Sequence, residues 1–455
     1  MRRLIDLRKG HPKAANLQHQ RIALACRQAA SRLDVASEAS FPLQYTIGSF
    51  GTPRFLGRLT RFLEDSYGGR CFEDGLLTTN GVSHGIELAC GALTSPGDSV
   101  WMETPSYFLA HQIFVDHGLK VQGVPSDAHG LDTDALARML STAELGPPPK
   151  LLYLVPSHGN PSAATLPLAR RERLLALAEE YSFVVVTDDV YHLLDWSRAP
   201  VPRLLELDVS FQARVAKGDT GKPGVGKDEA ALAAAKASAN AAEDEEDDSY
   251  TNFDRDGAKP SSGGWSGDGR VISLGSFTKI LAPGLRLGWA EASPALVKRL
   301  SERGYMVSGG SVAPFASEIV SELLQSGAQA EVLAELVADY SASASALIDA
   351  VKASGCLELL AEPRGGMFAF CTLPEGMTAG EVLPVAERHG VVFLPAAVCA
   401  PTAPAATFER CIRLCFAFEE VAAIVEGVAR IKAAIEEIQA ASVRNEPQTT
   451  RQRTA

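Results

Sequence analysis

The chain has 455 residues and a net charge of −12, so it is too long for the usual single hydrophobic core and has no excess of basic residues. We therefore expect two domains, and we expect neither a nucleic acid nor an anionic membrane surface as a partner. No apolar run reaches the roughly 18 residues of a membrane-spanning helix, and the apolar part of residues 1–7 is too short for a secretory signal.

The spacing of cysteines and histidines narrows the chemistry further. The eight cysteines are scattered without a C-x-x-C pair, which is typical of reduced, mostly buried thiols in a cytosolic protein. The nine histidines include no H-E-x-x-H or other metal-ligand spacing. We therefore expect a cytoplasmic protein and no metal site.

The first part of the chain reads as an extended segment followed by two helices. Residues 4–12 form the extended segment, which contains Gly10. A weakly amphipathic helix is predicted over 16–38 and a second over 56–63, and Tyr45 lies between them. Because the extended segment begins at residue 4, we expect no transit peptide.

Two strand ends follow, each with a polar turn. Asn80-Gly-Val-Ser83 lies where a strand ends and a helix begins. Backbone N–H groups at a helix N-terminus bind phosphate without a particular side chain, so the amides of Val82 and Ser83 are candidates for a phosphate site. The strand that starts at Ser99 ends in Glu-Thr-Pro-Ser-Tyr107, which presents the flat ring of Tyr107.

Two more apolar strands end in polar residues. Leu151-Leu-Tyr-Leu-Val155 is a continuous apolar run, typical of a parallel strand buried on both faces, and Asn160 follows it. The next strand ends in Asp188, with Tyr191 just beyond, and the side chain of Asp189 should point to the opposite face. Open α/β sheets bind ligands at the carboxyl ends of their strands, so we expect these residues to share a site.

A third strand end carries a lysine that is suited to act as a nucleophile. The strand begins at Val271 and is followed by Ser276, Lys279 and Arg286. Burial among apolar neighbours and a nearby cation disfavour the charged form of an amine, and a neutral amine can form a Schiff base with a carbonyl. Lys279 is therefore the leading catalytic candidate.

Residues 207–269 place far more chain between Asp188 and Lys279 than a strand and a turn need. The stretch contains an Ala-rich run, glycine-rich segments and the acidic block Glu243–Asp248. Such a composition buries too little apolar area to offset chain entropy. We predict a largely disordered insertion there.

The last third of the chain changes from strand–helix alternation to long helices. These are predicted over 295–303, 314–326 and 331–353. The later segment Cys411–Phe418 alternates, which turns Ile412 toward the core and Arg413 to the other face. An arginine held on a rigid strand can bind a carboxylate through two hydrogen bonds.

Together these segments resemble the class I/II aminotransferases, the fold-type I enzymes that use pyridoxal 5′-phosphate (PLP). Ser276-Phe-Thr-Lys279 followed by Ala-Pro-Gly-Leu-Arg286-Leu-Gly-Trp289 is similar to the family's cofactor-lysine segment. Further similar segments are Leu43-Gln-Tyr45, Glu103-Thr-Pro-Ser-Tyr107, Asn160-Pro161, Asp188-Asp-Val-Tyr191, Arg364-Gly-Gly-Met-Phe368 and Ile412-Arg-Leu414. The chain departs from the family pattern at Thr46, Val82, Ser162-Ala163 and Ala396.

The resemblance implies a role for each matching residue. Lys279 holds the cofactor aldehyde as an aldimine and moves the proton during catalysis, Asp188 pairs with the pyridine nitrogen, and Tyr107 stacks on the ring. Asn160 and Tyr191 bind the phenolic oxygen. The phosphate is bound by Val82, Ser83, Ser276, Arg286 and, from the neighbouring subunit, Tyr45. The substrate is bound by Arg413, Gly10 and Asn160, with its α-carboxylate at Arg413.

The resemblance also implies the architecture, an α/β fold in which a mostly parallel, seven-stranded-type sheet lies between helices in a large domain beside a smaller α+β domain. The expected divisions are 1–42 as an N-terminal segment of the small domain, 43–293 as the large PLP-binding domain, 294–441 as the small domain and 442–455 as a flexible tail.

The segments are most similar to the aminoadipate, kynurenine and aromatic aminotransferase group. The expected reaction is a ping-pong transfer of the amino group of an L-amino acid to a 2-oxo acid such as 2-oxoglutarate, in a homodimer with a shared active site. Two alternatives stay open. One is a PLP-dependent C–S lyase or synthase, because pocket geometry decides between these reactions, and the other is a non-catalytic PLP-binding sensor.

Overall fold

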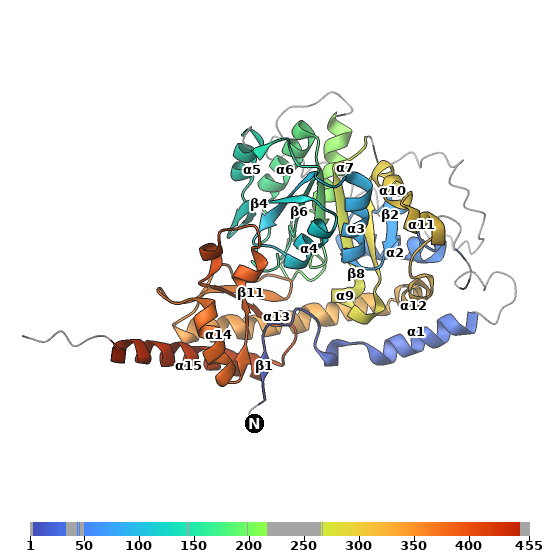
Figure 1. The fold of residues 1–455 in the computed structure, drawn as a ribbon. Coiled ribbons are helices and arrows are strands. Elements are labelled where there is room, and N and C mark those ends of the chain that lie inside the picture. The colour runs from blue at the N-terminus through green and yellow to red at the C-terminus, as the bar shows by residue number, and fades with distance from the viewer. Residues whose placement is uncertain are drawn as a thin grey trace, which may run out of the picture.

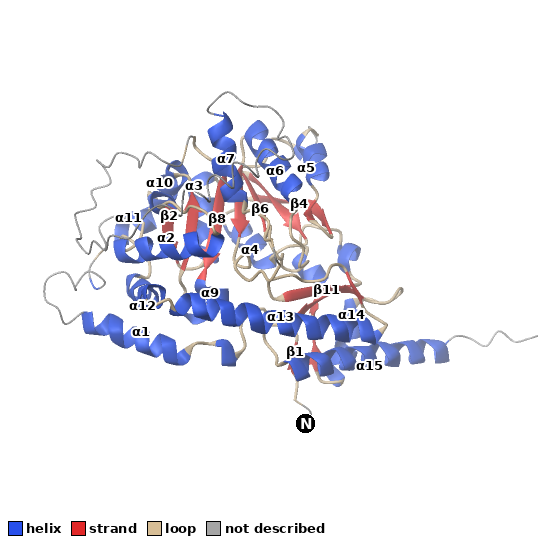
Figure 2. Cartoon of the chain, turned by 180° about the vertical axis from the view of Figure 1, so that it is seen from behind, coloured by secondary structure: helices blue, strands red, loops and turns tan. Residues whose placement is uncertain are grey.

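The computed structural model describes residues 3–32, 43, 45, 50–142, 145–197, 199–215, 265 and 267–445. Its centre is an eight-stranded sheet with helices on both faces (Figures 1 and 2). In sheet order the strands are β2 (Leu76–Thr79), β9 (Gly288–Ala292), β8 (Val271–Ser276), β7 (Val184–Asp188), β6 (Leu151–Leu154), β3 (Ser99–Thr104), β4 (Lys120–Asp127) and β5 (Gly130–Leu131). This confirms the predicted α/β class, and β5 is a two-residue strand added by a hairpin at one edge.

Most neighbours in this sheet are parallel. β8, β7, β6, β3 and β4 run in one direction, while β9 runs against both β8 and β2. From β3 the chain moves outward to β4 and then returns to β6 on the other side of β3. Such a reversal of strand order leaves a crevice at the carboxyl ends of the strands.

Alternation along the central strands divides the apolar core between the two faces of the sheet. Leu151 and Tyr153 pack into the cluster that contains helices α2 (Pro53–Tyr67), α3 (Val82–Leu93) and α4 (Phe108–Asp116). Leu152 and Leu154 pack into a second cluster with α5 (Thr133–Leu140), α6 (Leu168–Tyr181) and α7 (Leu204–Val215). The continuous apolar run therefore reflects burial on both faces.

A second, antiparallel sheet lies below the large one in Figure 1. Its strands, in order, are β10 (Glu358–Leu359), β11 (Phe368–Thr372), β14 (Cys411–Cys415) and β13 (Leu394–Pro395). The N-terminal strand β1 (Ile5–Asp6) pairs in parallel with β12 (Val391–Val392) beside it. The N-terminal segment is thus fixed next to elements from the end of the chain.

The remaining helices are mostly C-terminal. The long helix α13 runs beneath the large sheet toward the small one, and α1 and α12 lie near its first half (Figure 1). Their bounds are α1 (His19–Arg32), α9 (Phe277–Ile280), α10 (Pro294–Ser301), α11 (Gly304–Gly309), α12 (Pro314–Gln325), α13 (Ala328–Ser354), α14 (Ala379–Arg388) and α15 (Val421–Asn445). Of the helix predicted over 16–38, residues 33–38 lie outside the described part of the chain.

Two observations bear on the predicted divisions of the chain. Helix α10 follows the expected boundary at 293–294 and packs against helix α3 and strand β9. Helix α7 runs to Val215 and buries Leu207 and Asp208, so the start of the 207–269 stretch is helical. The rest of the predicted insertion, apart from Trp265 and 267–269, and the tail beyond Asn445 lie outside the described residues.

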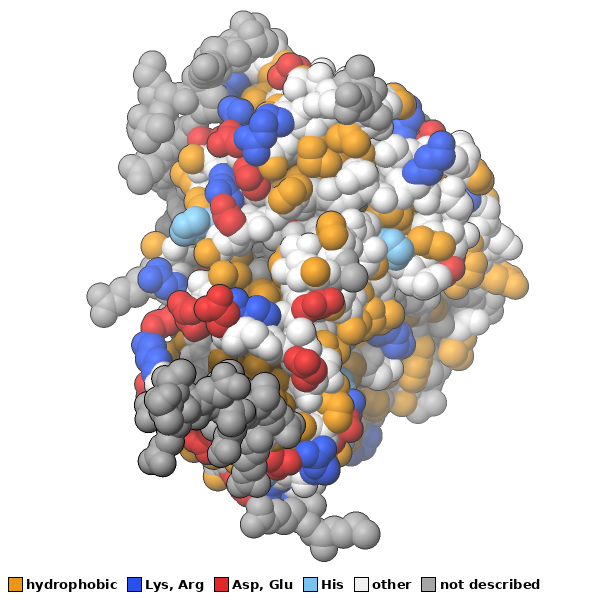
Figure 3. Space-filling view, turned by 60° about the vertical axis from the view of Figure 1, so that its left-hand side comes forward, with side chains coloured by type: hydrophobic (Ala, Val, Ile, Leu, Met, Phe, Trp, Pro, Cys, Tyr) orange, Lys and Arg blue, Asp and Glu red, His pale blue; other side chains and the backbone are white. Residues whose placement is uncertain are grey.

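Among the described residues, no helix combines the length and the apolar composition that crossing a membrane requires. On the face drawn in Figure 3, acidic and basic side chains are interspersed, with no large patch of one sign.

Candidate active site

The predicted site residues converge at the carboxyl ends of adjacent parallel strands. In the register of the sheet, Tyr153 of β6 lies beside Val186 of β7, and Asp188 of β7 lies beside Leu274 of β8. The loop after β6 carries Asn160, and Lys279 follows β8. This is the crevice left by the reversal of strand order between β3 and β6.

Lys279 lies in the short helix α9, which starts directly after β8 and is capped by the hydroxyl of Ser276. The Lys279 Nζ donates a hydrogen bond to the carbonyl oxygen of Gly10 at 2.5 Å. Burial lowers the pKa of Lys279 to about 8, and the positive charges of Arg413 and Arg286 act in the same direction. The amine is therefore much easier to deprotonate than a lysine in water.

Asp188 is a buried carboxylate with one oxygen available for a ligand. Its Oδ2 accepts a hydrogen bond from the hydroxyl of Tyr153 at 2.8 Å, and its Oδ1 is buried without a partner among the described residues. Burial raises the pKa of Asp188 to about 6, and the charge of Asp189 adds to this effect. Asp189 accepts hydrogen bonds from the hydroxyls of Thr187 and Ser273, both at 2.6 Å. Its side chain lies on the opposite face of the sheet from that of Asp188.

Two tyrosines lie near Asp188. Tyr107, half-buried at the start of α4, and Tyr191, buried just after β7, both have a raised pKa, first because of burial and then because of the charge of Asp188. The ring of Tyr191 meets the ring of Phe368 edge-on, with centroids 5.9 Å apart. Aromatic surface therefore borders the acidic centre of the site.

The start of helix α3 forms an anion cradle. Gly81 caps the helix at a φ of 81°, a conformation that favours glycine, and leaves the first-turn amides of Val82 and Ser83 without intrahelical acceptors. The Arg286 Nη2 donates to the carbonyl oxygen of Asn80 at 3.2 Å and lies over the same turn. Helix dipole and guanidinium together favour a phosphate there.

Ser276 is less directly presented to an anion. Its hydroxyl oxygen lies 2.8 Å from Thr278 Oγ1 and 3.2 Å from the carbonyl oxygen of Leu287, and it accepts the Thr278 amide at 3.1 Å. The structure therefore places this hydroxyl as the cap of the helix that carries Lys279.

Arg413 reaches the site from the small sheet. Its side chain is 5% exposed and donates from Nη1 to Asn160 Oδ1 at 2.7 Å and from Nη2 to the carbonyl oxygen of Arg8 at 2.6 Å. Its Cζ lies 4.1 Å from the ring centroid of Phe368. A Cβ on Gly10 would lie 2.5 Å from Phe368 Cζ, so glycine lets the N-terminal segment approach this ring.

Tyr45 lies outside this cluster. Its side chain is 82% exposed, and none of the contacts described above involves it. Most of its chain neighbours, including Thr46 and Gly48, lie outside the described residues. The structure thus brings together every predicted site residue except Tyr45.

Two residues near the centre of the site, Tyr153 and His11, were not predicted from the sequence. The hydroxyl of Tyr153 donates a hydrogen bond to Asp188. A tyrosine within an otherwise apolar strand could have been recognised from the sequence as a residue with a polar partner, because a buried O–H needs an acceptor. His11 also lies near the site. Burial is the main cause that lowers the pKa of His11, and the positive charge of Lys279 is the second. No pattern of spacing marks His11, because its position depends on long-range packing.

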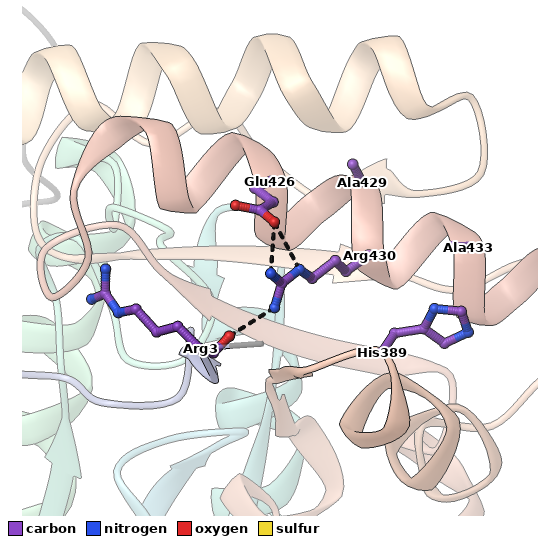
Figure 4. A pocket seen from close by; sticks show the side chains of 6 residues that line it. All are labelled: Arg3, His389, Glu426, Ala429, Arg430 and Ala433. Atoms are coloured by element: carbon purple, nitrogen blue, oxygen red, sulfur yellow. Dashed lines mark hydrogen bonds and ion pairs between the residues drawn. The ribbon is translucent and has the colours of Figure 1, made fainter. Parts of the chain in front are cut away.

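A separate hollow on the described surface lies away from these residues. It is a groove of about 350 Å³ between Arg3, His389 and helix α15 (Figure 4). The guanidinium of Arg430 there is already bonded to Glu426 and to the carbonyl oxygens of Arg3 and Gly390. The groove has none of the predicted catalytic groups.

Comparisons with known proteins show the family and the fold. The family model described as aminotransferase class I and II matches residues 3–212. An α-aminoadipate aminotransferase of Thermus thermophilus, solved in complex with N-(5′-phosphopyridoxyl)-L-leucine, superposes with a TM-score of 0.72 at 27% identity over 96% of this chain and 93% of that one. The chain belongs to the class I and II aminotransferases. It is therefore an enzyme, a transaminase, and its cofactor is PLP.

Other aminotransferases are similar over most of the chain. The aromatic-amino-acid aminotransferase 1 of Thermococcus litoralis is 27% identical over 78% of this chain and 72% of its own length. The 2-aminoadipate transaminase of Thermus thermophilus is 29% identical over 79% and 75%. A multiple-substrate aminotransferase of Thermococcus profundus superposes with a TM-score of 0.74 at 25% identity, covering 97% of this chain and 93% of that one.

The residues present fit this cofactor. The buried Asp188 Oδ1 lacks a partner within the described part of the chain, and a protonated pyridine nitrogen is the donor that would satisfy it. The amides of Val82 and Ser83 with Arg286 suit a phosphate, and the amine of Lys279 suits an aldehyde.

Proposed function

We propose that this aminotransferase moves the amino group of an L-amino acid, aromatic or 2-aminoadipate-like, to a 2-oxo acid such as 2-oxoglutarate in a ping-pong cycle. The observation that carries the proposal is the convergence of Lys279, Asp188 and Arg413 in one crevice. The activities for which two relatives are named support the substrate class, since one is an aromatic-amino-acid aminotransferase and the other a 2-aminoadipate transaminase.

Each residue then has a task in holding the cofactor. Lys279 would bind the aldehyde and Asp188 the pyridine nitrogen, with Tyr107 against the ring and Asn160 and Tyr191 at the phenolic oxygen. The amides of Val82 and Ser83, with Ser276, Arg286 and a partner subunit's Tyr45, would bind the phosphate. When bound, PLP supplies an electron sink for the bonds at the substrate α-carbon.

The proton chemistry falls to Lys279. Its amine, with a pKa lowered to about 8 by burial, is neutral in about a tenth of molecules at about pH 7, far more than for a lysine in water. A neutral amine can accept the proton from the substrate α-carbon as a general base. The ammonium group that results can then donate that proton to a second atom of the reacting system as a general acid. Tyr107 lies close enough to Asp188 for the negative charge of Asp188 to contribute to raising the pKa of Tyr107. We assign Tyr107 to the catalytic residues.

The lowered pKa predicts how fast PLP attaches to the apoprotein. Burial disfavours the charged form of Lys279. The neutral, nucleophilic amine is therefore protonated only as the pH falls through about 8, whereas an ordinary lysine is protonated as the pH falls through 10.5. The rate of attachment is measured from the absorbance of bound PLP. It should rise with pH, and the midpoint of the rise should lie near pH 8. Free N-acetyl-lysine in the same buffers is the control, and an enzyme midpoint near 10.5 would show that Lys279 is solvated.

Arg413 is assigned to the substrate α-carboxylate. In Arg413→Lys the fork that holds both Asn160 and the Arg8 carbonyl is lost while the charge stays. We expect kcat/KM for the amino donor to fall by on the order of 10²-fold, mainly through KM, because two hydrogen bonds to a charged group are affected. Steady-state kinetics measure this.

A matched control for Arg413 lies on the surface. Arg430 also donates to backbone carbonyls and to a carboxylate, but in the groove of Figure 4. Arg430→Lys should leave KM unchanged. An equal loss in the two variants would refute the assignment of Arg413.

We further propose that the active site is completed by a second copy of the chain. Tyr45 is 82% exposed, and Tyr305, whose ring meets that of His84 at 5.6 Å, is 65% exposed. His84 belongs to the first turn of α3, so exposed aromatic surface lies beside the phosphate cradle. Such surface is typical of an interface between subunits.

Mixing two impaired variants tests whether Tyr45 acts across the interface. If it does, a heterodimer of Lys279→Ala and Tyr45→Phe subunits contains one site with both native residues, so activity should exceed that of either parent after subunit exchange. If Tyr45 acts within its own subunit, mixing restores nothing. Sedimentation of the wild-type protein reports the dimer itself.

The experiment that tests the proposed reaction uses the PLP-loaded protein with a panel of L-amino acids and 2-oxoglutarate. Glutamate formation supports transamination. Release of pyruvate and ammonia without glutamate would instead favour the C–S lyase, and bound PLP without any turnover would favour a sensor. Because all eight cysteines are unpaired, we place this reaction in the reducing environment of the cytoplasm.

The division of the chain is also a proposal. We infer a large PLP-binding domain that ends beyond α10, because that helix packs on the large sheet. We assign the N-terminal segment to the small domain, because β1 pairs with β12.

A further inference from the structure

His158 occupies an unusual position in the loop between β6 and α6. Its side chain is 3% exposed, and its backbone has a φ of 50°. A residue with a side chain rarely adopts this left-handed conformation unless its surroundings hold it there. The contacts of the ring show what holds it.

Both ring nitrogens of His158 are engaged. Nε2 lies 2.9 Å from Asp195 Oδ2, and because a carboxylate only accepts, Nε2 carries the proton. Nδ1 lies 3.3 Å from the hydroxyl of Thr165, and the backbone N–H of His158 donates to the same oxygen at 3.1 Å. The ring is therefore fixed in position and in orientation.

The same ring lies at the junction between the large sheet and the small one. A Cβ on Gly365 would lie 2.3 Å from His158 Nε2, so the ring rests directly on that glycine. Asp195 and Gly365 form an antiparallel bridge, and the Gly366 amide donates to the Leu194 carbonyl oxygen at 2.9 Å. His158 thus joins the loop after β6 to the segment that leads into β11.

From this junction the chain leads in two directions to Arg413. Asn160, in the same loop as His158, accepts from Arg413 Nη1 at 2.7 Å. Phe368, the first residue of β11 just after Gly366, lies under the Arg413 guanidinium at 4.1 Å. A shift at His158 would therefore move both supports of the guanidinium.

We propose that His158, through its bond to Asp195 and its contact with Gly365, is a positioning residue that orients Asn160 and Phe368 and thereby aims the Arg413 guanidinium at the substrate carboxylate. This inference rests on the proposed function, because it takes Arg413 as the carboxylate site. It assigns His158 no contact with the substrate.

The test compares PLP-loaded wild type with His158→Phe and Asp195→Asn. Phenylalanine keeps the ring but loses the bond to Asp195, and Asp195→Asn weakens the same bond from the other side. We expect glutarate, an unreactive dicarboxylate, to bind about 10-fold more weakly in each variant by calorimetry, because the guanidinium is misaimed. KM for the amino donor should rise similarly, while kcat changes less than about threefold.

Two further readouts separate positioning from a general structural effect. In the double variant the loss should not exceed that of the worse single variant, because one bond is removed in all three. Hydrogen exchange at the Gly366 amide and across 156–163 should accelerate in His158→Phe. The control His389→Phe removes a surface histidine–carboxylate pair, to Glu437 at 2.8 Å, and should change none of these values.

Several outcomes would overturn the proposal: wild-type glutarate affinity in both variants, additive losses in the double variant, or unchanged exchange in His158→Phe. If His158→Phe does not fold, Asp195→Asn decides the question alone. If the wild type binds PLP but transfers no amino group, the proposed reaction is wrong. Glutarate affinity and hydrogen exchange then still test the positioning role of His158.

Discussion

Lys279→Ala is expected to abolish covalent attachment of PLP and to lower kcat by on the order of 10⁴-fold or more. The expectation combines two losses, of the nucleophile that binds the aldehyde and of the group that moves the α-proton. Among the contacts described at the site no other lysine replaces it, and the neighbouring cations are the guanidinium groups of Arg413 and Arg286, which are not nucleophiles.

Borohydride reduction locates the attachment directly. Reduction of the PLP-loaded protein followed by digestion and mass spectrometry should find the pyridoxyl group on the peptide that contains Lys279 and on no other. Lys298→Ala is a matched control, because Lys298 is an exposed lysine paired with Glu302 at 3.1 Å. It should retain the label on Lys279 and full turnover.

Lys279→Arg separates charge from nucleophilicity. Arginine keeps a cation near the Gly10 carbonyl but is neither a nucleophile nor a base at neutral pH. It should therefore be as inactive as Lys279→Ala. Substantial turnover in either variant, or label on another lysine, would remove Lys279 from the centre of the mechanism.

The strand ends were predictable from the sequence because their signals are local. An apolar run that stops at a polar residue marks the carboxyl end of a buried strand, and parallel strands bring such ends to one edge. The structure accordingly places Asn160, Asp188 and Lys279 in one crevice. The helix start at Val82 was visible for the same reason, as a glycine turn before an apolar run.

Contacts between distant parts of the chain were not predictable in this way. The pairing of Arg413 with the Arg8 carbonyl and the bond of Lys279 to Gly10 depend on how the N-terminal segment packs across the small sheet. Likewise spacing does not reveal the carboxylate partner of His158, because Asp195 comes from another loop. Such positions follow only from tertiary packing.

Asp188→Asn is expected to lower kcat by about 10²- to 10³-fold while PLP stays bound. Asparagine has nearly the same shape and still accepts the Tyr153 hydroxyl, so packing changes little. It lacks the negative charge that keeps a pyridine nitrogen protonated, and charge stabilisation in a buried site is worth effects of this size. Steady-state kcat, measured at saturating donor and acceptor, reports the loss.

The adjacent residue provides the control for Asp188. Asp189 is also a buried carboxylate, but it accepts from Thr187 and Ser273 on the opposite face of the sheet. Asp189→Asn removes a charge of the same sign one residue away and should retain most of kcat. Removing that charge should also lower the pKa of Asp188, since Asp189 contributes to raising it after burial. If Asp189→Asn were the more damaging change, the charge required by the cofactor would be that of Asp189, and the assignment of faces at the end of β7 would be reversed.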